Sequence, residues 1–353
     1  ALPIFGLRTL TVIQKAIKAL AARGIRIDID AIPLDDPKVY EVFARGETIG
    51  LFQFESSGMQ EYLRKLKPTC LEDLIAMNAL YRPGPMDYIN DFIRGKRDAA
   101  SISYLHPLLR PLLEETYGIA VYQEQVIKMA TEVGGFSLGN ADLLRRAMGK
   151  KDLEIMARER VHFTDGANQR GVPNKVADEI YDQMAKFAGY GFNKSHAACY
   201  SLVAYQTGFL KVHYPAEFMA ANLSSEMSST ARVVVLLEEC RRMGLEVLAP
   251  DVNESFADFI VSEGRIRFGL GAVKNVGRGA IEAIVAGREK KGRFATLVDL
   301  VCAIDLQAVN KKVLESLIQA GAMDSLTGTR AQKFEGLEKD INYAQAINRS
   351  EAL

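Results

Sequence analysis

Apolar residues recur at helical spacing along most of the 353-residue chain, and this pattern restricts the fold more than any other feature. Near the N-terminus, Leu10, Ile13, Ile17 and Leu20 follow the period of one buried helix face. Residues 197–211 are apolar almost all round, which is typical of a helix buried inside a bundle. The sequence therefore predicts a mainly α-helical, multi-helical fold.

Local signals predict where several of these helices begin and end. Asp36 followed by Pro37 has the residue types of an N-cap and a first helical position. Gly24 lies where a C-cap is expected, and Pro83-Gly84-Pro85 ends a helix predicted over residues 71–81. Residues 26–32 alternate apolar and polar types, which predicts a short strand or an extended link.

The pattern changes near residue 230. After a predicted helix there is a short strand at residues 246–249, and the alternation in residues 259–268 predicts a β-hairpin that turns at Glu263-Gly264. Two short helices on either side of residues 275–279 form a helix-hairpin-helix element. The predicted segments are residues 1–36, residues 37–230, a small α/β segment at 231–326 and a helical C-terminal tail at 327–353.

Composition excludes some functional classes. Lys plus Arg and Asp plus Glu number 44 each, so overall charge does not indicate a nucleic-acid binder, and such a role must rest on local patches. The four cysteines form no CxxC pair, which favours reduced thiols over disulfides or a zinc site. No apolar run approaches the roughly 20 residues of a membrane span. We expect a cytoplasmic protein that does not associate with membranes.

The first candidate site is the adjacent pair Arg145 and Arg146, in a predicted helix that Lys150 and Lys151 follow. Two neighbouring guanidinium groups repel each other, and one anion with several oxygens would suit both. A triphosphate has that geometry, since the planar fork of arginine binds phosphate through two hydrogen bonds. The alternative is one arginine in an intramolecular salt bridge and the other in water.

The second candidate is a polar run at the start of the apolar helix: Asn193, Lys194, Ser195 and His196. Phe192 before it offers a stacking face, and a helix N-terminus favours anions. Ser195 and His196 cannot easily act as a nucleophile–base pair because consecutive side chains diverge, so no catalytic residue is predicted. The alternative is an ordinary capped helix with a packed His196.

The third candidate is the glycine turn of the predicted hairpin: Lys274, Asn275, Gly277, Arg278 and Gly279. Backbone N–H groups and flanking cations in such a turn grip a phosphate without reading bases. Residues 265–293 contain eight Lys or Arg residues and two Glu residues, a local basic patch in a neutral chain. The alternative is a helical hairpin used only for packing.

Other motifs have weaker functional interpretations. Gly135-x-Ser137-x-Gly139 matches a hydrolase elbow, which requires a preceding strand, whereas a helix is predicted there and Ser137 fits an N-cap. Asp28-x-Asp30 has the spacing of a metal-binding pair but is better explained as a solvated pair. The proline-locked turn at residues 79–86, which contains Arg82, is equally typical of a positioned loop and of a helix stop.

Several long strings occur in the order seen in one family. From about residue 6 to residue 326 the chain resembles the alpha subunits of bacterial DNA polymerase III, the C-family of replicative DNA polymerases. The strings include Phe52-Gln-Phe-Glu-Ser-Ser-Gly-Met59, Asn78-Ala-Leu-Tyr-Arg-Pro-Gly-Pro85, Leu143-Leu-Arg-Arg-Ala-Met-Gly-Lys-Lys151, Gly191-Phe-Asn-Lys-Ser-His-Ala-Ala198 and Tyr214-Pro-Ala-Glu-Phe218.

The resemblance implies the fingers region of a DNA-directed DNA polymerase, from the last edge of the palm to just before the sliding-clamp-binding domain. Arg145 and Arg146 would contact the triphosphate of the incoming dNTP, and residues 193–196 would line the pocket near its sugar and base, where His196 would help to reject ribose. Residues 274–279 would touch the duplex of primer-template DNA. Implied partners are the other polymerase III holoenzyme subunits, and the sliding clamp through a domain not present here.

One departure concerns the metal. The family has a metal-binding Asp of the palm where Pro3 stands here, and its other two palm carboxylates lie upstream. The resemblance therefore implies Mg²⁺ in the intact enzyme, no metal bound by these residues, and no DNA synthesis by them alone. A non-catalytic helix-hairpin-helix DNA-binding or interaction module is the alternative function.

Overall fold

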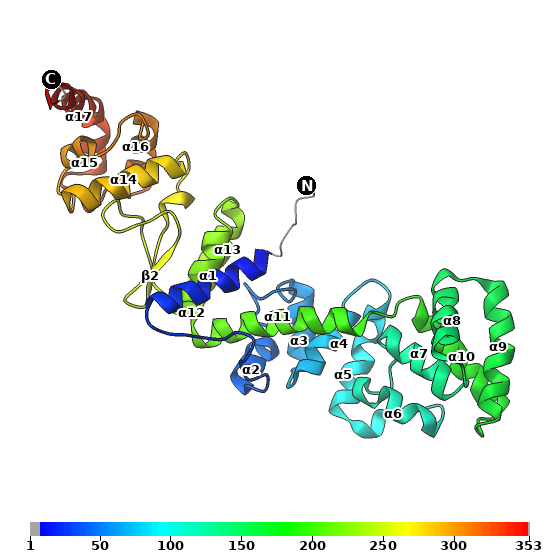
Figure 1. Cartoon of the computed structure of the whole chain (residues 1–353). Helices are drawn as coiled ribbons and strands as arrows, with labels where there is room; N and C mark the ends of the chain where they lie inside the picture. The colour runs from blue at the N-terminus through cyan, green and yellow to red at the C-terminus, as the bar shows by residue number, and fades with distance from the viewer. Residues whose placement is uncertain (1–7, 352–353) are drawn as a thin grey trace. The chain divides into compact units, whose positions relative to one another are not determined.

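Residues 8–351 are described by a computed structural model of the chain, with side chains up to residue 347, and helices dominate them (Figure 1). The chain divides into two compact units. The central unit is Ala31–Gly208, and the terminal unit combines the N-terminal helix with Phe209–Leu353. The segment boundaries predicted at residues 36, 230 and 326 stay a prediction, and Pro3 lies outside the described residues.

The central unit consists of helices and short 3₁₀ turns. Its α-helices are α2 (Pro37–Arg45), α3 (Ser57–Leu66), α4 (Leu71–Leu80), α5 (Ile89–Arg97), α6 (Arg110–Leu113), α7 (Gln123–Glu132), α8 (Leu138–Lys150), α9 (Leu153–Asn168), α10 (Asn174–Ala188) and the first part of α11 (Lys194–His213). The 3₁₀ turns are Pro85–Tyr88, Ala99–Ser101, Pro107–Leu109 and Glu114–Thr116. Helices α7 to α10 pack against one another around Phe163, Tyr181 and Met184, which are fully buried.

Two helix starts confirm the local predictions. The Asp36 side chain accepts a hydrogen bond from the Lys38 N–H at 2.9 Å, and Pro37 is the first residue of α2. The Ser137 Oγ accepts from the Asn140 N–H at 3.3 Å and caps α8. Because helix α7 precedes Ser137, the strand that a hydrolase elbow requires is not present at this position.

The terminal unit contains the remaining elements. They are α1 (Arg8–Ala22), α12 (Pro215–Ser225), α13 (Thr230–Arg242), α14 (Arg278–Lys291), α15 (Leu297–Ala303), α16 (Lys311–Gln319), α17 (Arg330–Glu351), β1 (Val247–Leu248), β2 (Ile260–Ser262) and β3 (Arg265–Arg267). Helix α1 packs along α12, and helices α14 to α17 enclose a core that includes Leu300, Leu314 and Leu317. The predicted C-terminal helix packs into this core through Leu337.

The three strands form a small sheet in the order β1-β3-β2. Strands β2 and β3 are antiparallel with Val261 opposite Ile266, which confirms the predicted hairpin. Glu263 and Gly264 have φ angles of 51° and 77°, as the central residues of a type I′ hairpin turn require. Strand β1 pairs with β3 in parallel.

Residues 26–32 form a link, which is one of the two alternatives that the sequence pattern left open, and there the Asp28 Oδ1 accepts from the Asp30 N–H at 3.1 Å in a local turn. One expectation needs correction. The first helix of the hairpin is only a 3₁₀ turn, Leu270–Ala272, because Val273 already has extended backbone angles. No helix in the described part of the chain is long and apolar enough to cross a membrane.

Candidate functional sites

The adjacent arginines of α8 share one carboxylate. The Arg145 Nη2 lies 2.9 Å from Asp142 Oδ1, and the Arg146 Nη2 lies 2.8 Å from Asp142 Oδ2. The hydrogen bond from Arg145, with the charges of both guanidinium groups, lowers the pKa of Asp142. The Arg145 side chain is only 17% exposed, whereas that of Arg146 is 63% exposed. Arg146 is therefore the more accessible of the two to an external anion.

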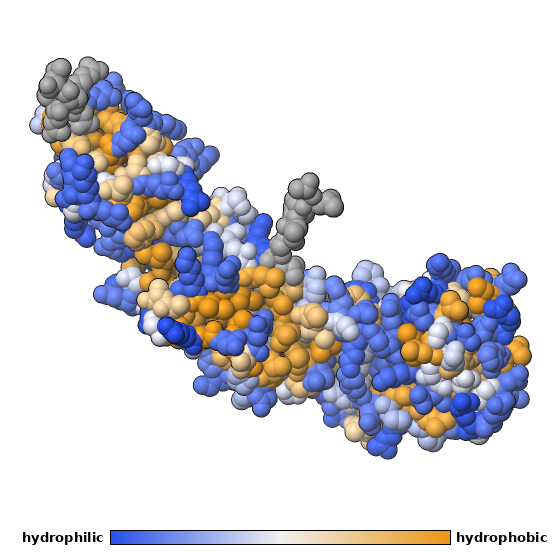
Figure 2. Space-filling model, in the orientation of Figure 1, coloured by the Kyte–Doolittle hydropathy of each residue, from blue (hydrophilic) through white to orange (hydrophobic). Residues whose placement is uncertain are grey.

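Arg146 lines a hollow between α8 and α9. The hollow has a volume of about 480 Å³ and is lined by basic side chains, such as Lys150 and Arg158, and by the acidic side chains of Asp152 and Glu159. Figure 2 shows apolar patches among the polar surface of these two helices, where Leu138, Leu143 and Leu153 are 73%, 62% and 77% exposed.

The start of α11 is capped from within the chain. The Asn193 Oδ1 accepts from the His196 N–H at 2.8 Å. Both carboxylate oxygens of Glu124, on α7, lie 3.1 Å from the Lys194 backbone nitrogen, and the Asn193 Nδ2 donates to Glu124 Oε1 at 3.0 Å. The Lys194 Nζ forms an ion pair with Glu115 at 2.7 Å. The anion position expected at this helix N-terminus is thus filled by the Glu124 carboxylate.

His196 belongs to a ladder of aromatic rings. Its ring centroid lies 5.4 Å from that of Phe192 and 4.3 Å from that of Tyr200, and Tyr200 lies 5.1 Å from Phe52. Phe192, His196 and Tyr200 border a second hollow of about 180 Å³, whose lining also includes Arg82 and Asn78. His196 is exposed at this hollow rather than packed in the core, unlike the alternative considered from the sequence.

The loop before α11 is held against two other segments. The Phe192 N–H donates to the Val121 carbonyl at 3.2 Å, and the Gln123 N–H donates to the Phe192 carbonyl at 2.9 Å. The Arg82 guanidinium lies over the Phe192 ring, 4.2 Å from its centroid. The sequence left the turn around Arg82 open between a positioned loop and a helix stop, and its contacts identify a positioned loop.

The structure keeps the two candidate groups of the central unit in different places. Arg146 lines the hollow of α8 and α9, and His196 lines the hollow at the start of α11. Within residues 8–347, no hydrogen bond or ion pair of Arg145 or Arg146 reaches residues 193–196. Ser195 is exposed at the first turn of α11.

The hairpin of the terminal unit presents a glycine turn to solvent. Asn275 has a φ of +67° and donates from Nδ2 to the Ser316 Oγ at 3.2 Å. Gly277 precedes the first residue of α14, and Lys274, Arg278 and Gly279 are exposed. Arg278 is 87% exposed and forms an ion pair with its helix neighbour Glu282 at 3.1 Å. The exposed residues of this turn thus include the two cations, Lys274 and Arg278.

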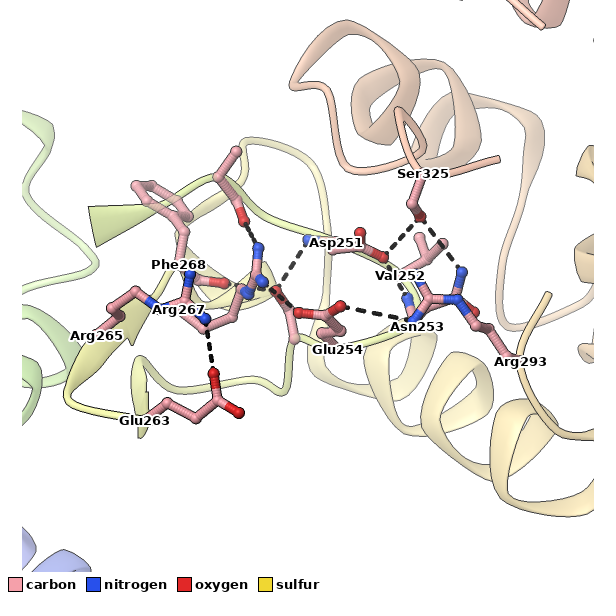
Figure 3. A network of polar contacts seen from close by, with 12 residues as sticks. Asp251, Val252, Asn253, Glu254, Glu263, Arg265, Arg267, Phe268, Arg293 and Ser325 are labelled. Atoms are coloured by element: carbon pink, nitrogen blue, oxygen red, sulfur yellow. Dashed lines mark hydrogen bonds and ion pairs between the residues drawn. The ribbon is translucent and has the colours of Figure 1, made fainter. Parts of the chain in front are cut away.

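Part of the basic patch of this region has a structural role. Arg267 donates to the Ala249 carbonyl at 2.8 Å and pairs with Glu254, which lies 3.5 Å from Arg293 (Figure 3). The Arg288 Nη1 donates to the Val252 and Ser255 carbonyls at 3.1 and 2.7 Å. These arginines hold the link between the sheet and α14. The exposed basic residues outside this network include Lys274 and Arg278 at the glycine turn and Lys290 and Lys291 at the end of α14.

A polar network ties the same link to the loop after α16. The Asp251 Oδ1 accepts from the Asn253 N–H at 2.7 Å and from the Ser325 Oγ at 3.0 Å (Figure 3). The Asn253 side chain also donates to the Phe294 carbonyl at 3.0 Å and accepts from its N–H at 2.8 Å. Hydrogen bonds therefore fix the segment that precedes the helix-hairpin-helix element to the segments that follow it.

Among the described side chains, no group of three or more His, Cys, Asp or Glu residues lies close enough together to hold a metal ion. The Asp28 and Asp30 pair is no exception, since Asp28 accepts a backbone hydrogen bond instead.

Comparisons with known proteins agree with the resemblance. Residues 9–171 match the profile of the bacterial DNA polymerase III alpha subunit finger domain, and residues 244–333 match a helix-hairpin-helix motif. The chain is 51% identical to the DNA polymerase III subunit alpha of Pseudomonas aeruginosa, 50% to that of Thermus aquaticus and 46% to that of Escherichia coli K12. The matches cover 97%, 96% and 99% of this chain but only 30%, 28% and 31% of those relatives.

Proposed function

Because this chain belongs to the family of bacterial DNA polymerase III alpha subunits, with a finger domain over residues 9–171, we propose that it binds the incoming dNTP and duplex DNA during template-directed synthesis. In the intact subunit a primer 3′-hydroxyl attacks the α-phosphate of the dNTP, its proton is lost, and the bond to the β-phosphate breaks to release pyrophosphate. The fingers contribute position and positive charge, which is most of what a protein adds to phosphoryl transfer. We expect the 353 residues alone to extend no primer.

The observation that carries this proposal is the hollow at the start of α11, where residues of the family's strings meet. His196 and Tyr200 offer ring faces there, and Asn78 and Arg82 offer polar atoms. Aromatic faces stack on nucleobases and sugars irrespective of sequence. In our proposal His196 and its neighbours Asn193, Lys194 and Ser195 receive the base and sugar of the nucleotide.

In this proposal the residues of α8 bind the polyphosphate of the nucleotide. Arg145 and Arg146 are already oriented by Asp142, so both guanidinium groups are held in place before a phosphate arrives. The separation of the two hollows requires the α7–α10 region to close toward α11 when the correct nucleotide binds. Such closure gives discrimination by induced fit.

The metal and the other partners belong to the proposal for the intact subunit. Mg²⁺ would be bound by the palm, and no catalytic step is assigned to a metal held by the described residues. Holoenzyme subunits and the sliding clamp are proposed partners of the full-length protein. A cytoplasmic location stays a prediction.

Replacing His196 by Ala in the full-length subunit should raise the KM for dNTP about fivefold, because stacking on one aromatic ring contributes roughly 1 kcal/mol or more. The measurement is steady-state primer extension with varied dNTP. His106→Ala is the control, since His106 caps a turn of the same unit outside this hollow. An unchanged KM for His196→Ala would remove His196 from the nucleotide site.

Duplex DNA binding is assigned to Lys274, Asn275, Gly277, Arg278 and Gly279. The slope of log K against log salt is negative, and replacing Lys274 and Arg278 together by Ala should reduce its magnitude by about two, roughly one for each lost phosphate contact. The measurement is duplex binding by the 353-residue chain over a salt series. Arg241→Ala on α13 removes an equally exposed cation away from the hairpin and is the control.

The same two experiments separate the proposal from its rival. A non-catalytic helix-hairpin-helix DNA-binding module predicts the change in salt slope together with an unchanged KM for His196→Ala. A hairpin used only for packing predicts no change in slope for Lys274→Ala and Arg278→Ala.

A further inference from the structure

Arg82 joins two loops that are 108 residues apart in the sequence. Its Nη2 donates to the Tyr190 carbonyl at 2.8 Å, and its Nε donates to the Ala79 carbonyl at 3.1 Å. Its guanidinium carbon lies 4.2 Å from the centroid of the Phe192 ring. One planar group thus binds the end of α4, a backbone carbonyl and an aromatic face at once.

The turn that carries Arg82 is itself fixed. Gly84 has a φ of +100°, and a Cβ at this position would lie 2.6 Å from the Tyr190 ring, so glycine is required by both backbone angle and space. The Asn78 Nδ2 donates to the Ser201 Oγ of α11 at 2.7 Å. The backbone around Arg82 is therefore held in place, and from it the Arg82 side chain contacts the loop at residues 189–193.

Movement of this loop would be transmitted directly to His196. The His196 ring packs against the Phe192 ring. The backbone N–H of His196 donates to the side chain of Asn193, the residue after Phe192. We infer that Arg82 is a positioning residue that clamps the loop at residues 189–193 and thereby sets the position of the His196 side chain. Its effect on nucleotide binding rests on the function proposed above, whereas its effect on the loop does not.

The contacts specify arginine rather than a cation in general. The two hydrogen bonds and the stacked face use the planar fork, which a lysine ammonium cannot reproduce. Burial lowers the pKa of Arg82, but arginine keeps its charge in proteins. Arg82→Lys is therefore a mild variant. It keeps the positive charge and the aliphatic part of the side chain, but it loses the planar group that makes the two hydrogen bonds and stacks on Phe192.

The loop is tested first by hydrogen exchange on the full-length subunit. The amides of Tyr190, Gly191 and Phe192 are hydrogen-bonded to Phe187 or Val121. We expect them to exchange about tenfold faster in Arg82→Ala and in Arg82→Lys, since weaker anchoring favours local opening. Should the alanine variant not fold, the lysine variant gives the answer.

Arg160→Ala is the matched control for exchange. Arg160 lies over the Tyr181 ring, 4.6 Å from its centroid, and donates to the Asp178 carboxylate at 3.1 Å, so the substitution removes a stacked guanidinium and its hydrogen bonds elsewhere in the central unit. Its substitution should leave exchange at residues 190–192 unchanged. Unchanged exchange in both Arg82 variants would overturn the inference.

Kinetics then separate this inference from the proposed function. Arg82→Ala should raise the KM for dNTP about as much as His196→Ala, and the double variant should be little worse than either, because residues that act as one unit are not additive. Faster exchange with unchanged KM supports the clamp and contradicts the nucleotide site. Unchanged exchange contradicts the clamp whatever the kinetics.

Discussion

Replacing Arg146 by Ala in the full-length alpha subunit is expected to lower kcat/KM for dNTP incorporation about 10- to 100-fold. The reason is that hydrogen bonds to a charged group contribute about 1.5–3 kcal/mol, and each 1.4 kcal/mol is about tenfold in rate. Arg146 is 63% exposed, so its loss should not destabilise the fold. The measurement is primer extension under single-turnover and steady-state conditions, with thermal unfolding as the check on folding.

The matched control is Arg45→Ala. Arg45 is 60% exposed and pairs with Glu41 at the same i,i+4 spacing that Arg146 shares with Asp142. The Arg45→Ala substitution therefore removes an equivalent surface arginine and an equivalent helix ion pair, and it leaves α8 unchanged. Equal kcat/KM values for Arg146→Ala and Arg45→Ala would exclude Arg146 from the triphosphate site.

Features set by neighbouring residues could be predicted from the sequence. The start of α2 follows from Asp36 and Pro37, because a cap and a fixed φ act within one turn of the helix. The hairpin between β2 and β3 follows from alternation on both sides of Glu263-Gly264. Ser137 at the start of α8 was likewise identified as a cap rather than a nucleophile.

Features that depend on distant residues could not be predicted. Glu124 fills the N-terminus of α11 from 70 residues away, and no local pattern marks it as the partner of Lys194. The basic patch of residues 265–293 could be counted, but its partial neutralisation by Glu254 could not. The alternation at residues 26–32 predicted a strand or a link, and with no neighbouring strand to pair with, the link resulted.

The second large effect concerns stability, and it lies in the terminal unit. Lys211 and Glu239 form an ion pair at 2.6 Å with side chains only 2% and 5% exposed, and Arg242 donates to both oxygens of Glu239 at 2.8 Å. Replacing Glu239 by Ala removes this shared acceptor from two cations. We expect a loss of about 3–5 kcal/mol in the free energy of unfolding, because removing one partner of a buried ion pair is strongly destabilising.

Glu238→Ala is the control that isolates burial. Glu238 is the preceding residue of α13 and pairs with Arg241 at 3.2 Å, but its side chain is 66% exposed. Both variants replace Glu by Ala in one helix, so helix propensity cancels, and the exposed pair should contribute no more than about 1 kcal/mol. Thermal or denaturant unfolding gives the comparison, and equal losses for the two variants would contradict a stabilising role for the buried pair.

The pH dependence of this difference has a definite sign. Burial acts to raise the pKa of Glu239, but the hydrogen bonds and charges of Arg242 and Lys211 outweigh it, so the folded pKa lies below the usual glutamate value. A carboxyl group with a depressed folded pKa stabilises the fold above its unfolded pKa and loses this contribution as pH falls through the folded pKa. The gap in stability between the parent chain and Glu239→Ala should therefore be full at neutral pH and shrink on acidification, while a gap that grows at low pH would show that Glu239 is held protonated.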